Sequence, residues 1–169
     1  NRHVRMNAQR LLRELVESKG GSEAGGPGGI AGDAVREVSG SLRSGEAGTR
    51  MSALWAMGSM GLLAPEQLSA ALNDADPVVR RNAAQAAEVF AAKDAAVDLE
   101  KRIGDDDARV RTAALVALAA AEPSAAAVGA VVKAWPRFAD DFERSAAVGV
   151  LSANRAAAIA AILDSGSEQ

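Results

Sequence analysis

The sequence contains no cysteine and a single histidine, His3. Without cysteine, the segment has no disulfide bond, no thiolate metal site, no covalently attached c-type haem and no cysteine nucleophile. No second histidine accompanies His3 to complete a metal site, so we interpret it as a solvated side chain near a helix N-terminus. We therefore expect no catalytic residue, metal site or cofactor in this segment.

Aromatic residues are also scarce, because the chain has three Phe, two Trp and no Tyr. Strands of β-sandwiches and barrels are rich in aromatic and β-branched residues, so this composition argues against both folds. Alanine provides 40 of the 169 residues, and 35 of these alanines follow residue 50. Since alanine has the highest helix propensity and lets helix axes approach closely, we predict an all-α fold.

The sequence has no apolar run long enough to cross a membrane and no strongly basic region. The formal net charge is −3: residues 1–50 carry 8 basic and 6 acidic groups, and residues 51–169 carry 11 and 16. We therefore predict that the segment neither spans a membrane nor binds nucleic acid. It begins at Asn1 without a signal-peptide pattern, which indicates a piece of a longer chain.

One pattern recurs five times along the chain: an arginine, a small residue three positions later, and apolar residues six and seven positions later. The small residue is alanine in all five copies. This spacing places the small and apolar residues on one face of an amphipathic helix. The five arginines, called the repeat arginines below, are Arg5, Arg50, Arg80, Arg111 and Arg144.

Weaker helical patterns lie between these segments. They cover residues 33–43, 65–73, 94–103, 124–135 and 155–163. Two antiparallel helices every ~31 residues form a hairpin that cannot bury its apolar stripes alone, so successive hairpins must stack. We predict one domain over residues 1–169, an α-solenoid of about five repeats.

The interval between the first two repeat arginines is longer than the others. Residues 20–32 contain seven glycines and one proline, Pro27. Such a composition is typical of a flexible connection, and a longer loop costs little in closure entropy. We predict a flexible loop over residues 20–32.

The hairpin period and the residues around two repeat arginines resemble the HEAT repeat, particularly its short bacterial form. Pro65 opens a first helix, and Asp74 and Asp105 each lie six residues before Arg80 and Arg111. The resemblance implies a right-handed superhelix of helical hairpins. It also implies a structural ladder in which these aspartates and arginines connect the turns to the second helices of the hairpins.

The ladder pattern is interrupted in two repeats. Ser44 and Phe138 occupy the positions where the other repeats have the aspartate. We therefore expect Arg50 and Arg144 to have other partners.

Two stretches resemble a narrower group of proteins within the HEAT repeats. Residues 1–12 read NRHVRMNAQRLL, and residues 49–88 contain TRMSALWAMGSMGLLAPEQL. Both are similar to the HEAT region of large multidomain proteins of planctomycetes and verrucomicrobia, which lies between a sorbosone-dehydrogenase-like propeller and a c-type cytochrome module with a CxxCH motif. The resemblance implies an exported, periplasmic redox enzyme as the parent protein, with this segment as a non-catalytic spacer.

Three functions compete for a segment of this kind. The first is a scaffold that contacts a protein partner or neighbouring domains of the parent chain. The second is a nucleic-acid-binding HEAT-like protein of the DNA glycosylase type, which needs a basic concave surface and aromatics. The third is a lyase-type short HEAT protein, as in phycobilin attachment. The acidic charge and the lack of an acid–base group on one face favour the scaffold.

A partner surface is predicted on the second helices, two and five residues after each repeat arginine. These positions face away from the core columns. Trp55 has no obvious core role there and provides an aromatic anchor of the kind that partner surfaces use. We predict a docking site around Arg10, Trp55 and Gln85, flanked by Asn7 and Asn82.

Overall fold

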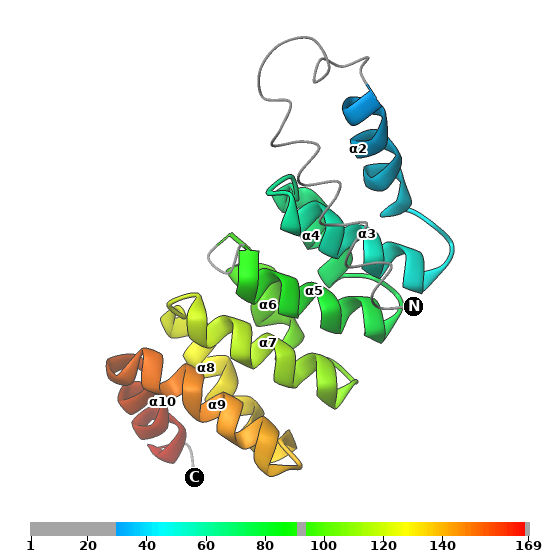
Figure 1. The fold of residues 1–169 in the computed structure, drawn as a ribbon. Helices are drawn as coiled ribbons and strands as arrows, with labels where there is room; N and C mark the ends of the chain where they lie inside the picture. Colours follow the sequence, from blue (N-terminus) through cyan, green and yellow to red (C-terminus); the bar gives the residue numbers. More distant parts are fainter. Residues whose placement is uncertain (1–29, 91–93, 168–169) are drawn as a thin grey trace. The chain divides into compact units, whose positions relative to one another are not determined.

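The computed structural model describes residues 30–90 and 94–167, and all regular elements in this part of the chain are helical (Figure 1). The all-α prediction is therefore confirmed. The helices are α2 (Ile30–Ser41), α3 (Ala47–Ser59), α4 (Pro65–Leu72), α5 (Pro77–Phe90), α6 (Ala96–Arg102), α7 (Ala108–Ala120), α8 (Ala125–Ala134), the 3₁₀ helix η1 (Trp135–Arg137), α9 (Asp141–Ala153) and α10 (Arg155–Ser167).

Helix α2 begins earlier than the sequence predicts. We assigned residues 30–32 to the glycine-rich loop, but the helix starts at Ile30. Asp33 lies in its first turn, where a negative side chain stabilises the helix by interacting with the positive end of the helix dipole. The rest of the predicted loop, and the predicted helix around Arg5, lie outside the described residues.

The chain divides into two compact units, with the boundary between Gln67 and Leu68, inside α4. In the first unit, α2 packs against α3. The side-chain amide of Gln67 donates to Ser39 Oγ at 3.0 Å and so attaches the start of α4 to α2. The prediction of a single domain over residues 1–169 stays a prediction.

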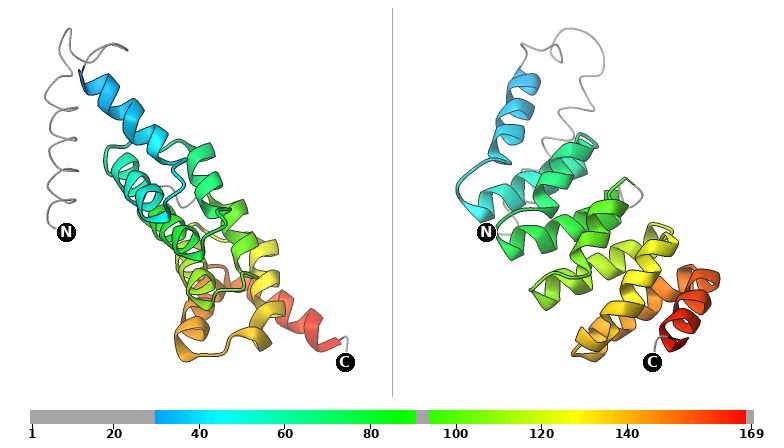
Figure 2. Two further views of the ribbon diagram at one scale, coloured as in Figure 1. Left: turned by 90° about the vertical axis from the view of Figure 1, so that its right-hand side faces the viewer. Right: turned by 180° about the vertical axis from the view of Figure 1, so that it is seen from behind.

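The second unit consists of stacked helical hairpins, the arrangement of an α-solenoid. The second helices of the hairpins pack side by side, α5 against α7 and α7 against α9. The first helices, α6 and α8, and the last helix, α10, form the other layer (Figure 2). Helix α6 packs on α7, and α10 packs on α8 and α9.

The alanine column of the repeat lies in the core, as predicted. The residues three positions after the four described repeat arginines, Ala53, Ala83, Ala114 and Ala147, are at most 4% exposed. Small residues also mark a close approach of α7 and α9, because a Cβ on Gly149 would meet the Cβ of Ala119 at 3.5 Å. Short side chains at these contacts let the helices pack closely.

Helix α3 ends in a turn that requires glycine. Gly61 has a φ of +68°, and its N–H donates to Gly58 O while that of Leu62 donates to Met57 O. These two bonds form a Schellman motif. We expect Gly61→Ala to lower the free energy of unfolding by ~1 kcal/mol, because a Cβ is strained at this φ. Urea denaturation followed by circular dichroism measures the change.

Gly40 provides the matched control for this substitution. It lies within α2, and a Cβ there meets nothing within 4 Å. Gly40→Ala should leave stability unchanged or raise it by up to ~1 kcal/mol through helix propensity. An equal loss in both variants would contradict the conformational explanation for Gly61.

Candidate partner-binding groove

Each described repeat arginine holds the loop that precedes its own helix. In every case the guanidinium donates to the carbonyl oxygen of the residue six positions earlier. The four bonds are Arg50 to Ser44 at 2.8 Å, Arg80 to Asp74 at 2.9 Å, Arg111 to Asp105 at 2.8 Å and Arg144 to Phe138 at 3.2 Å. Because the acceptor is a backbone atom, the bond forms whether or not that residue is an aspartate.

The carboxylate partner of Arg80 lies in the next repeat. Arg80 Nε and Nη2 donate to the two carboxylate oxygens of Asp105 at 2.8 and 2.9 Å. Burial pushes the pKa of Asp105 up, but hydrogen bonds from Arg80 and the Asp107 N–H, together with the charges of Arg80 and Arg102, bring it below its ordinary value. This pair connects α5 to the loop before α7.

Arg111 is paired in the same way, but with a glutamate that the sequence pattern did not single out. Arg111 Nε donates to Glu143 Oε1 at 2.7 Å, and the Ala139 N–H donates to Glu143 Oε2 at 3.0 Å. The Glu143 side chain is fully buried. Asp74, the first residue of the predicted ladder, accepts a hydrogen bond from the Asp76 N–H at 2.8 Å through its carboxylate.

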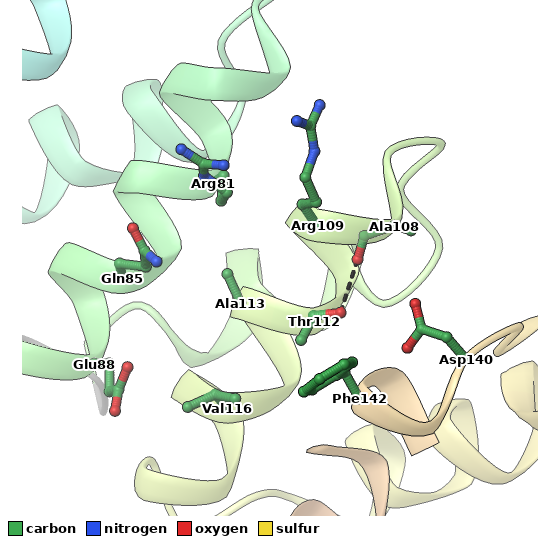
Figure 3. Close-up of a pocket in the computed structure, with 10 residues that line it drawn as sticks. All are labelled: Arg81, Gln85, Glu88, Ala108, Arg109, Thr112, Ala113, Val116, Asp140 and Phe142. Carbon is green, nitrogen blue, oxygen red and sulfur yellow. Dashed lines mark hydrogen bonds between the residues drawn. The ribbon is translucent and has the colours of Figure 1, made fainter. Parts of the chain in front are cut away.

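These ladder contacts position a groove of about 430 Å³ on the exposed side of the second helices (Figure 3). Helix α5 contributes Arg81, Gln85 and Glu88. Helix α7 contributes Arg109, Thr112, Ala113 and Val116, and the start of α9 contributes Asp140 and Phe142.

Apolar side chains line one part of the groove. Phe142 is 82% exposed and Val116 is 38% exposed. In the view of Figure 3, Phe142 and Val116 lie toward one end and Arg81 and Arg109 toward the other. The groove therefore combines an exposed aromatic ring with charged groups.

The charged groups of the groove differ in their partners. Arg109 Nη2 donates to Asp107 Oδ2 at 2.8 Å, and this hydrogen bond is the main cause of the fall in the pKa of Asp107 to about 2. Asp140 caps α9 by accepting from the Glu143 N–H at 2.8 Å. Arg81 has a buried Nε that meets no hydrogen-bond partner within the described part of the chain.

The outward face of the second helices differs from the predicted one by a residue. Asn82, two residues after Arg80, is only 7% exposed, and its Nδ2 donates to Val78 O in its own helix. Ala113 has the same register in α7 and is 9% exposed, because α5 and α9 flank α7 on both sides. The prediction of Asn82 as a surface contact was wrong, and its neighbour Arg81 lines the groove instead.

The other predicted docking residues have different positions. Gln85 is exposed and lines the groove. Trp55 is half-buried on α3, in the first unit. Asn7 and Arg10 lie outside the described residues.

Sequence reasoning missed Phe142, although a signal was present. Phe142 lies two residues before the repeat arginine Arg144, just as Arg109 lies two residues before Arg111. Positions two before and five after a repeat arginine are seven residues apart, nearly two helical turns, so they share one face. Extending the predicted stripe backwards by one heptad would have included this aromatic residue.

Within residues 30–90 and 94–167, no group of three or more His, Asp or Glu side chains could hold a metal ion. No single helix in these ranges is long and apolar enough to cross a membrane; α9 and α10 meet the criteria of length and composition only as a pair, and the chain bends by 112° between them.

Comparison with known families gives a match over part of the chain. The family described as HEAT repeats matches residues 64–152, which is more than half of the chain. A search of curated proteins found no match.

Proposed function

Because the chain belongs to the HEAT-repeat family, we propose that it is a non-catalytic scaffold whose groove between α5, α7 and α9 binds a segment of a protein partner. The observation that carries the proposal is the exposed ring of Phe142. Large aromatic residues on a surface are the usual anchors of protein interfaces. The groove volume of about 430 Å³ also lies within the range of about 300–1,000 Å³ that is typical of ligand-binding pockets.

The test is selection of binding peptides from a random display library against the whole chain. We expect the selected peptides to lose at least about tenfold in affinity for Phe142→Ala, because the anchor and its buried apolar area are removed. Fluorescence anisotropy with labelled peptides measures the dissociation constants. Ile159→Ala is the control, since Ile159 is 62% exposed on α10 and does not line the groove.

Two outcomes would contradict the proposal. The first is a selection that yields no binding peptide, and the second is equal affinity for the parent and Phe142→Ala chains. Duplex and single-stranded DNA form a further arm at ~0.15 M salt, where we expect no more than weak non-specific binding. Tight, salt-sensitive DNA binding would favour the nucleic-acid alternative.

We also propose the biological setting that the sequence resemblance implies. The segment would be a spacer in an exported multidomain redox protein, which places it outside the cytoplasm, with neighbouring domains of the parent chain as partners and without a cofactor of its own. Residues 1–12 and 49–88 support this proposal. Reading the complete open reading frame tests it: a propeller upstream and a CxxCH motif downstream are expected, and the absence of both would refute it.

A further inference from the structure

Arg81 forms no ion pair within residues 30–90 and 94–167. It is half-buried on α5, its side chain lines the groove, and its buried Nε meets no acceptor in the described ranges. Burial weakens the solvation of a cation, and a negative group beside the guanidinium restores part of the lost electrostatic interaction. The groove therefore favours a negative group near Arg81.

The second arginine of the groove differs from Arg81 because it has a carboxylate partner. Arg109 already forms hydrogen bonds to both carboxylate oxygens of Asp107, at 3.2 and 2.8 Å. The carboxylate of Asp140 is similarly engaged at the N-terminus of α9. The charges that remain for a ligand are those on α5.

Glu88 provides the opposite charge on the same helix. It is exposed, lines the groove and takes part in no ion pair within the described residues. Glu88 lies seven residues after Arg81, which is a separation of about 10 Å along the helix axis at 1.5 Å per residue. Gln85 lies between them and presents an exposed amide (Figure 3).

We propose that the groove selects an extended protein segment with an acidic side chain opposite Arg81, a basic side chain opposite Glu88 and an apolar side chain against Val116 and Phe142. A segment in the extended polyproline II conformation has three residues per turn and rises about 3.1 Å per residue, so an acid and a base three positions apart share one face and lie about 9 Å apart. Its free backbone groups can bond to the Gln85 amide, whereas those of a helix are already satisfied. This inference rests on the proposed function and specifies the partner of the same groove.

Double-mutant cycles with a selected peptide test the charge assignment. The peptide is compared with its Asp→Asn or Glu→Gln version, each against the parent chain and Arg81→Gln. We expect loss of the peptide carboxylate to weaken binding about tenfold for the parent chain and to have little effect for Arg81→Gln. A second cycle pairs Glu88→Gln with removal of the basic side chain.

Arg155→Gln is the matched control, because Arg155 is exposed on α10 outside the groove. Arg155→Gln should show no coupling to the acidic or the basic side chain of the peptide. Thermal melts of each variant verify folding.

The outcomes separate this inference from the proposed function. Selected peptides that lose affinity for Phe142→Ala but show no coupling to Arg81 or Glu88, or that lack the acid and base three positions apart, would overturn the charge assignment alone. Peptides that are insensitive to Phe142→Ala would overturn the groove itself. Coupling in both cycles, together with the three-residue spacing, supports the inference.

Discussion

Glu143→Ala is expected to lower the free energy of unfolding by about 3–5 kcal/mol. The Glu143 side chain is fully buried, and Arg111, whose side chain is 9% exposed, donates to it at 2.7 Å. Removing the carboxylate leaves a nearly buried cation without its counter-charge and the Ala139 N–H without its acceptor. Urea denaturation of the parent and variant chains measures the difference.

Two further variants define the cause of this loss. Lys101→Ala removes an exposed ion pair with Asp98, for which we expect a change of at most ~1 kcal/mol. The double variant Arg111→Met/Glu143→Leu removes both buried charges and should recover part of the loss. The recovery is only partial because the double variant also loses the hydrogen bonds that Arg111 donates to the carbonyl oxygens of Asp105 and Asp106. A loss as small as that of Lys101→Ala would contradict the buried-pair explanation.

The helices from α4 onwards follow closely from the sequence. The expected helix over residues 65–73 is α4 (Pro65–Leu72), and the expected helix over 155–163 extends to Ser167. Predictions of this kind succeed because the periodicity of apolar residues and the high helix propensity of alanine are local properties that can be read from the sequence of a single helix. The segment 124–135 also ends as expected, since Pro136 stops α8 at Ala134 and a short 3₁₀ turn follows.

The partner of Arg111 could not be predicted from a repeat pattern. The pattern expects an aspartate six residues before Arg144, but Phe138 occupies that position and is fully buried against Trp135. The carboxylate comes instead from Glu143, one residue before Arg144. Electrostatic pairing depends on where an oxygen lies in space, so two sequence positions can provide the same contact.

The groove could be predicted only in part. Gln85 was placed correctly on the exposed face, whereas Asn82 was not, because flanking helices cover more of a second helix than a single helical wheel shows. The contrast between Arg81 and Arg109 arises from hydrogen bonds across a turn and from burial between helices. Neither is visible in the spacing of residues.

Ala114→Leu is expected to lower the free energy of unfolding by about 1–3 kcal/mol through overpacking. Ala114 is fully buried on α7, a helix that packs against α5, α6 and α9. Added methylenes have no free volume there, so the flanking helices must move apart or side chains must leave their preferred rotamers. The change in the denaturation midpoint at constant slope measures this effect.

Ala120→Leu separates overpacking from a general effect of leucine on α7. Ala120 is exposed in the last turn of the same helix, and the substitution there should change stability by no more than ~0.5 kcal/mol. If both variants unfold at the parent midpoint, the alanine three residues after Arg111 does not limit how closely the helices pack. A loss confined to Ala114→Leu would show that this alanine column sets the spacing between hairpins, which explains why alanine occupies it in each of the five repeats.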